Sequence, residues 1–190
     1  MTSQLTRQRT HSWTDPAETA AAASDVDGLT FLRALAAGEV PPAPIATTLG
    51  MTLEEVEEGR VVFGLVPAEF HFNPIGSVHG GVYATVLDSA CGCAVHSTLP
   101  AGARYTSLDL TVKFLRGLDV AVGPVRCEGR VLHSGRRTPW PRPASPTARV
   151  GCTRTPPAPA WCCANPDLSG RRRPPPPARR WWWCAAASPP

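Results

Sequence analysis

The pattern of apolar and polar residues divides the first 138 residues into segments of distinct type. Apolar residues recur at helical spacing in residues 26–40, and again in residues 79–96 with many small residues among them. Residues 51–69 favour two short strands joined by a turn. Residues 104–117 alternate strictly, and residues 118–137 continue as a strand. A buried helix followed by long antiparallel strands is typical of the α+β class.

The composition changes abruptly after Thr138. Residues 139–190 hold 14 of the 22 prolines, five of the six tryptophans, and eight arginines against one acidic residue, for a net charge of +7. Residues 1–138 carry 11 basic and 14 acidic residues, and their net charge of −3 brings the chain to +4. The mildly acidic body gives no reason to expect a nucleic-acid partner. We therefore expect a disordered lead-in (1–25), a folded domain (26–138) and a disordered tail (139–190).

The sequence also bears on compartment and on metal binding. No window approaches the roughly 18 apolar residues that cross a bilayer, and the lead-in lacks the apolar stretch of a signal peptide. Cys91, Cys93 and Cys127 suit small buried side chains in a reducing compartment. On a helix Cys91 and Cys93 point apart, so together with His96 they favour structural cysteines over a metal site. We expect a cytoplasmic protein with no metal and no membrane partner.

Candidate chemistry gathers in residues 72–88, FNPIGSVHGGVYATVLD. Gly80 and Gly81 at a helix start leave backbone N–H groups free at the positive end of the helix dipole, where they can hold an oxyanion. Asn73 can add an amide donor from the preceding loop. Asp88 is the one charge on a buried helix, and a buried carboxylate is costly unless it is used or paired. Oxyanion donors with a carboxylate base fit hydrolysis of an activated acyl compound.

The structural alternative is that the glycine pair permits tight packing and Asp88 is a satisfied core acid. The spacing N-x-x-G-x-x-H-G-G-x-x-x-x-x-x-D favours the functional interpretation, and its residues are Asn73, Gly76, His79, Gly80, Gly81 and Asp88. This motif resembles that of the PaaI-like (phenylacetate-degradation) family of hotdog-fold acyl-CoA thioesterases. YTSLDLTVKFLRG is similar to the family's strand after the helix, and the resemblance runs from Ile45 to Thr138.

The resemblance implies a hotdog fold, in which a curled antiparallel sheet wraps a long central helix. Two such units pair into a homodimer, often doubled to a homotetramer, with thioester sites at the interface. The N–H of Gly80 and the side chain of Asn73 would hold the thioester carbonyl. Asp88 would act as general base on water or as nucleophile, and Ser107 would orient the water. The substrate is an acyl-CoA, so CoA enters as part of the substrate and no separate cofactor is expected.

The resemblance also implies substrate-binding residues. His79 and Gly81 stand at the helix start, where His79 fits a hydrogen-bonded corner residue better than a base. The positions that match the family's contacts with the CoA phosphates are Arg116, Arg130, His133, Arg136 and Arg137. A non-catalytic hotdog module that binds acyl-CoA, or an inactive pseudogene product, is the alternative to a hydrolase.

The tail conflicts with this fold, because a hotdog unit needs further strands after Arg137. Residues 139–190 keep only Val150 and Leu168 among Val, Ile, Leu and Phe, so we expect the C-terminal strands to be missing. Shifted two bases on from the start of the Pro139 codon, one GC-rich back-translation gives two alternating strands. We therefore hypothesise that the tail is an out-of-frame translation. The alternatives are a genuine disordered tail, a polyproline ligand or an Arg-Trp patch for nucleic acid.

Overall fold

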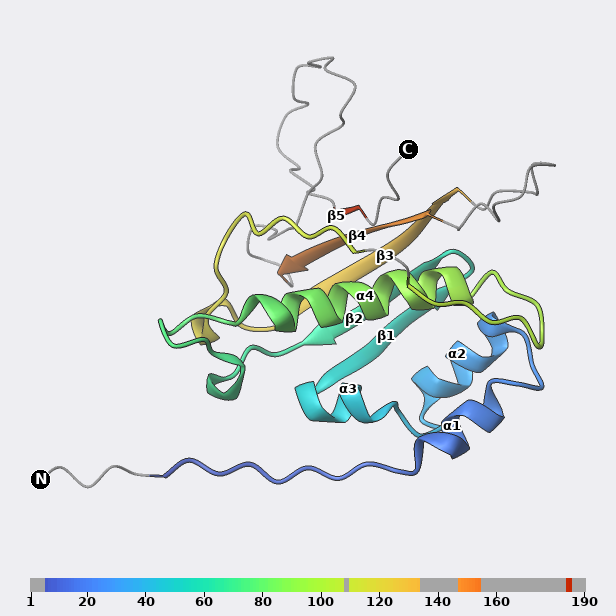
Figure 1. Ribbon diagram of the computed structural model, residues 1–190, viewed down its shortest axis with the longest axis horizontal. Coiled ribbons are helices and arrows are strands. Elements are labelled where there is room, and N and C mark those ends of the chain that lie inside the picture. Colours follow the sequence, from blue (N-terminus) through green and yellow to red (C-terminus); the bar gives the residue numbers. More distant parts are fainter. Residues whose placement is uncertain (1–5, 108–109, 134–146, 155–183, 186–190) are drawn as a thin grey trace, which may run out of the picture.

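A long helix lies across an antiparallel sheet in the computed structural model, which describes residues 6–107, 110–133, 147–154 and 184–185 (Figure 1). The helix is α4 (Gly80–His96), and the strands follow the order β1-β2-β3-β4-β5. Their bounds are β1 (Met51–Glu57), β2 (Arg60–Leu65), β3 (Val125–His133), β4 (Thr147–Arg154) and β5 (Cys184–Ala185). The predicted α+β class and the helix-on-sheet arrangement of a hotdog fold are confirmed.

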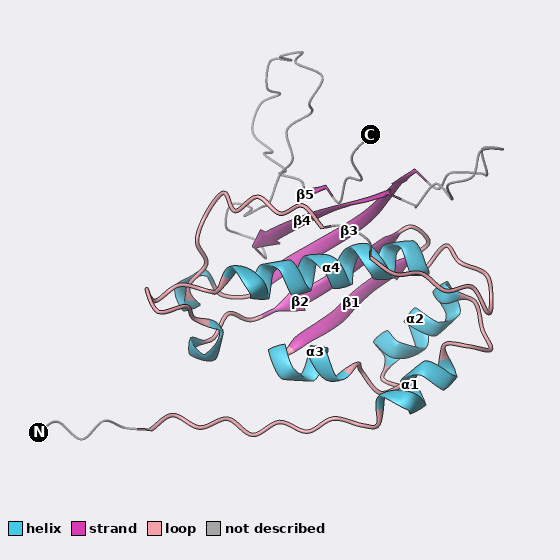
Figure 2. Ribbon diagram, viewed as in Figure 1, coloured by secondary structure: helices cyan, strands magenta, loops and turns pink. Residues whose placement is uncertain are grey.

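Three helices precede the sheet and lie together beside β1 (Figure 2). They are α1 (Pro16–Ala22), α2 (Gly28–Ala37) and α3 (Pro44–Leu49). The prediction of a disordered lead-in over residues 1–25 is wrong at α1. Asp15 accepts a hydrogen bond from the Ala17 N–H at 2.9 Å, Pro16 is the first helical residue and alanines follow, so a capped helix forms despite the polar surroundings.

The sheet packs closely against α4. Val61, Phe63 and Leu65 of β2 are buried on the side of α4, where Ala90 is fully buried. A Cβ added to Gly129 of β3 would lie only 2.1 Å from the carbonyl oxygen of Ala90. Glycine at 129 and small residues on α4 therefore allow the helix backbone to approach the strand.

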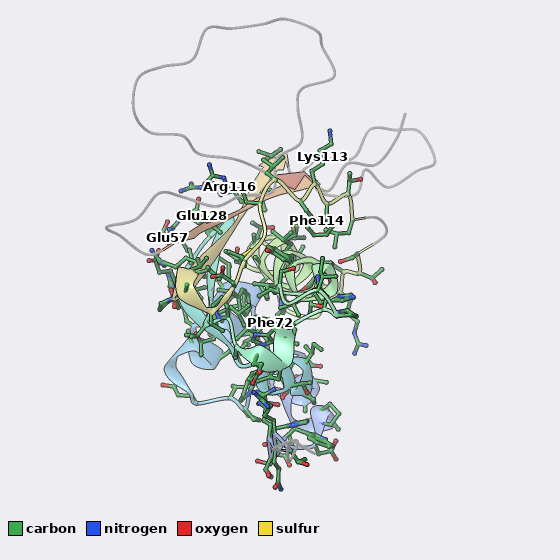
Figure 3. The ribbon with its side chains drawn as sticks, turned by 90° about the vertical axis from the view of Figure 1, so that its left-hand side faces the viewer. Glu57, Phe72, Lys113, Phe114, Arg116 and Glu128 are labelled. Atoms are coloured by element: carbon green, nitrogen blue, oxygen red, sulfur yellow. The ribbon has the colours of Figure 1, made fainter. Side chains whose placement is uncertain are left out.

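Ion pairs cross-link the three strands β1, β2 and β3. Arg60 Nη2 lies 2.7 Å from Glu55 and 2.9 Å from Glu128, and Arg60 Nη1 lies 3.0 Å from Glu57. Arg126 bonds to Glu55 as well, so hydrogen bonds from Arg60 and Arg126 hold the pKa of the Glu55 carboxyl below its usual value. Figure 3 labels Glu57 and Glu128, two members of this network.

The strand predicted at residues 104–117 is absent from the described part of that segment, residues 104–107 and 110–117. A strand needs a hydrogen-bonded neighbour, and none of the described strands pairs with this segment. The alternation still reports burial in part, since Val112 packs against the core. Of the predicted strand at residues 118–137, the described residues 118–133 form a strand only at Val125–His133, after a 3₁₀ turn at Val120–Val122.

The expectation that residues 139–190 supply no strand is wrong at β4, which pairs antiparallel with β3, and at the short β5. Strand pairing uses backbone groups that every residue except proline can offer in full. β4 occupies a proline-free stretch between Pro146 and Pro156, and it contains two threonines and a valine, which favour extended structure.

Candidate functional site

The start of α4 is shaped by the hydrogen bonds of its first backbone N–H groups. His79 is the N-cap, and its Nδ1 accepts a hydrogen bond from the Gly81 N–H at 2.9 Å, while its carbonyl accepts one from Val82 at 2.9 Å. Gly81 is thus not the free donor that the sequence predicts, whereas His79 has the corner role that it favours. Among the residues that the structure describes, the Gly80 N–H has no acceptor. That donor lies at the positive end of a helix 17 residues long.

A buried histidine that the sequence did not single out holds this corner. The His79 N–H donates to the carbonyl of His71 at 2.8 Å, where His71 ends the 3₁₀ turn Glu69–His71. His71 Nδ1 accepts from the Ala68 N–H at 3.1 Å, so its Nε2–H donates to the Leu49 carbonyl at 2.8 Å. Burial lowers the pKa of His71, which favours the neutral ring that these two bonds require.

Asn73 shapes the loop before α4. Its Oδ1 accepts hydrogen bonds from the Ile75 and Ser77 N–H groups, both at 3.1 Å, and its Nδ2 donates to Ser77 Oγ at 2.9 Å. Gly76 has φ of 84°, a conformation that glycine adopts without strain. The motif positions 73 and 76 are therefore explained by loop geometry.

Asp88 and Ser107 are brought together, although 19 residues separate them. Ser107 Oγ donates to Asp88 Oδ1 at 2.6 Å, and Asp88 is half-buried on the flank of α4. Burial raises the pKa of the Cys93 thiol to about 12, and the charge of Asp88 is the smaller of the two causes. Burial, followed by the charges of Cys93 and Asp88, raises the pKa of the Tyr105 hydroxyl. Cys93 is thus a protonated thiol that provides no nucleophile at neutral pH.

Gly80 and Asp88 do not meet within one chain. Eight residues of helix separate them, which at 1.5 Å per residue is about 12 Å along the axis. A carbonyl group and one attacking water cannot bridge that distance. Any site that uses both groups has to take them from two copies of the helix.

The predicted phosphate contacts are scattered. Residues 110–117 run along the start of α4, and Figure 3 shows Lys113 pointing away from the body of the molecule. Arg116 lies on that segment, where its carbonyl accepts a hydrogen bond from Tyr83 Oη at 3.3 Å. Arg130 instead bonds to Glu128 on β3, and because Gly129 faces α4, Arg130 points to the other face of the sheet.

Three of the predicted phosphate contacts receive no side-chain description. His133 ends β3, and its side chain is outside the described set. Arg136 and Arg137 lie outside the described residues altogether.

The described residues contain no group of three or more His, Cys, Asp or Glu side chains that could hold a metal ion. No helix within them is both long and apolar enough to cross a membrane.

Residues 75–138, which include α4, Asp88 and Ser107, match the model of the thioesterase superfamily. Over these residues the chain is similar to the thioesterase superfamily. A Halobacterium salinarum protein described as a candidate esterase is 37% identical over 73 residues, which is 36% of this chain and 48% of that protein. The match thus spans about half the length of that relative.

Solved structures share the fold of this domain. A candidate thioesterase of Ralstonia eutropha JMP134, described as phenylacetic acid degradation-related, aligns with a TM-score of 0.56 at 22% identity, over 81% of this chain and 94% of that one. The PaaI protein of the E. coli phenylacetic acid degradation operon aligns with a TM-score of 0.55 at 20% identity, over 73% and 91%. These likenesses show the hotdog fold.

Proposed function

We propose that this protein hydrolyses acyl-CoA thioesters to a free acid and CoA. The observation that carries the proposal is the Asp88–Ser107 hydrogen bond of 2.6 Å on the flank of α4, whose first residue presents an N–H without an acceptor among the described residues. A base and an oxyanion donor are the two groups that this hydrolysis requires. The similarity to the thioesterase superfamily supports the same chemistry.

In the proposed reaction the Gly80 N–H donates to the thioester carbonyl oxygen and stabilises the negative charge that forms there. Ser107 occupies Oδ1 of Asp88, which leaves Oδ2 to take a proton from the attacking water. The new C–O bond forms, the C–S bond breaks, and the CoA thiolate takes up the proton from Asp88. Asp88 thus acts as a general base in this proposal, and the acid and CoA leave with no net change to the protein.

The proposed active form contains at least two copies of the chain. The separation of about 12 Å between Gly80 and Asp88 along one helix supports a homodimer or homotetramer in which each copy supplies half of a site. Arg116, on the segment beside the start of α4, is the described arginine that we propose to contact a CoA phosphate.

The Asp88→Asn variant tests this function. We expect the rate of thiol release from an acyl-CoA to fall about 100-fold to 10,000-fold, because a general base is lost while the side chain keeps its shape. Asp25→Asn, which changes an exposed Asp far from α4 in the sequence, is the matched control and should keep the wild-type rate. Wild-type hydrolysis by Asp88→Asn would refute the mechanism. Binding of acyl-CoA without hydrolysis by the unchanged chain would identify a non-catalytic module.

Labelled water separates the two roles of Asp88. In a single turnover in H₂¹⁸O, a general base places the label in the released acid. A nucleophilic Asp88 would instead form an acyl anhydride, and its hydrolysis can leave the label in the Asp88 carboxylate. We expect the label in the acid, and label in the protein would assign the nucleophilic role.

A further inference from the structure

An aromatic ring lies against the first residue of α4. A Cβ added to Gly80 would stand 3.1 Å from Cζ of Phe114 and 3.5 Å from each of its Cε atoms. The ring thus lies in contact with the flank of the turn that presents the Gly80 N–H. Phe114 remains 55% exposed, so the rest of its apolar surface faces outward beside that donor.

Tyr83 holds the ring in this position. The Tyr83 and Phe114 ring centroids are 5.5 Å apart with an interplanar angle of 66°, an edge-to-face contact. Tyr83 is buried, and its Oη donates to the carbonyl of Arg116, two residues beyond Phe114. The described residues 110–117 form no strand, so side-chain contacts with α4, and not sheet hydrogen bonds, set the place of Phe114.

We propose that Phe114 is a specificity-determining residue that forms one wall of the acyl site and limits the bulk of the acyl group beside the Gly80 N–H. This inference rests on the proposed function, because it takes that N–H as the donor to the thioester carbonyl. A carbonyl bound there places its acyl substituent next to the ring. The ring occupies volume that a wide aromatic or branched acyl group needs, while its exposed face offers apolar contact to a narrow chain. The favoured substrates are therefore thioesters with short or unbranched acyl groups.

The test compares two thioesters of different bulk, acetyl-CoA and benzoyl-CoA. Phe114→Ala should raise the ratio of kcat/KM for benzoyl-CoA to that for acetyl-CoA at least about 10-fold, since removing a ring changes pocket volume by several carbon atoms. Phe114→Leu should give a smaller rise. Leu115→Ala, at a residue of similar exposure (44%) in the same segment, should leave the ratio unchanged. An unchanged ratio in Phe114→Ala, or an equal loss for both substrates, would overturn the inference.

A binding experiment separates this inference from the proposed hydrolysis. Ketone analogues of the two thioesters, with a methylene in place of sulfur, keep the carbonyl and cannot be hydrolysed. Calorimetry should show the same shift in relative Kd between wild type and Phe114→Ala. If hydrolysis is absent but the Kd ratio shifts, the proposed hydrolysis is refuted and the inference that Phe114 forms a wall of the acyl site is supported. If the intact chain binds neither analogue, or the Kd ratio is the same in wild type and Phe114→Ala, the inference about Phe114 is refuted.

Discussion

The two flanks of α4 use glycine in the same way but against different neighbours. On the sheet flank, a Cβ on Gly129 would meet the backbone oxygen of Ala90 at 2.1 Å. On the other flank, a Cβ on Gly92 would meet the Tyr105 ring at 3.0 Å, just as one on Gly80 would meet the Phe114 ring. A backbone inside a packed core cannot yield, whereas a half-exposed ring can turn. The candidate chemical groups Gly80, Asp88 and Ser107 all lie on the flank whose neighbours can adapt.

Restoring the reading frame should have the largest effect on the difference between the two flanks of α4. Sequencing the gene from the codons for Val131 to Ala164 should reveal an inserted or missing base near the Thr138 codon, if the tail is out of frame. In the restored chain the two strands that replace residues 139 onward, β4 and β5 included, can provide residues 104–117 with a hydrogen-bonded neighbour. Amide exchange in that segment should then slow by roughly 100-fold, which corresponds to about 3 kcal/mol of opening free energy.

Amides of β2 serve as the internal control for that exchange experiment, because β2 already pairs on both sides with β1 and β3. A gene whose codons confirm the tail as printed would contradict the frameshift hypothesis. Equal exchange in both chains would show that residues 104–117 lack a strand for another reason.

Helix and strand positions were predictable wherever local pattern and neighbours agree. The helix predicted over residues 79–96 is α4, the helix predicted in residues 26–40 contains α2, and the two strands expected in residues 51–69 are β1 and β2. Residues 104–117 show where the hydrophobic pattern alone does not predict a strand correctly. Alternation indicates which side chains share one face, but it does not reveal whether another strand is present to accept the backbone hydrogen bonds.

The candidate site was predictable only in part. The resemblance of the segment after α4 implied Ser107, which the structure joins to Asp88 by a hydrogen bond. The motif itself contains Asp88 and the N-cap His79. It gave Gly81 a free N–H, because the sequence does not show that His79 Nδ1 accepts from it. Phe114 and His71 were missed, since their importance comes from contacts between segments distant in the sequence.

Two glycine substitutions compare how rigid the two flanks of α4 are, and we expect their effects to be smaller than that of the restored reading frame. Gly129→Ala should lower the free energy of unfolding by about 3 kcal/mol, because the new methyl group forces α4 away from β3. Gly92→Ala should cost less than about 1 kcal/mol, because the Tyr105 ring can move and alanine favours helix. Urea unfolding with a fixed m-value measures both changes. Equal losses would show that the outer flank is as rigid as the sheet flank.

The smallest expected effect concerns what anchors the start of α4. Burial lowers the pKa of His71 from its ordinary value of 6.5, so below pH 6.5 the unfolded chain binds a proton that the folded chain excludes. Stability should therefore fall as the pH drops from 6.5 toward the lower folded pKa, where His71 protonates and Nδ1 loses its hydrogen bond from Ala68.

Urea midpoints at pH 7.5 and pH 5.5 would measure that loss, and His71→Gln should reduce the difference between the two midpoints, whatever it does to stability at pH 7.5. His96, whose pKa is also lowered by burial, contributes its own share, which His96→Gln removes separately. If His71→Gln leaves the pH dependence of the urea midpoint unchanged, protonation of His71 is not the cause of that dependence. In that case the start of α4 is held mainly by the N-cap and by the rings of the outer flank.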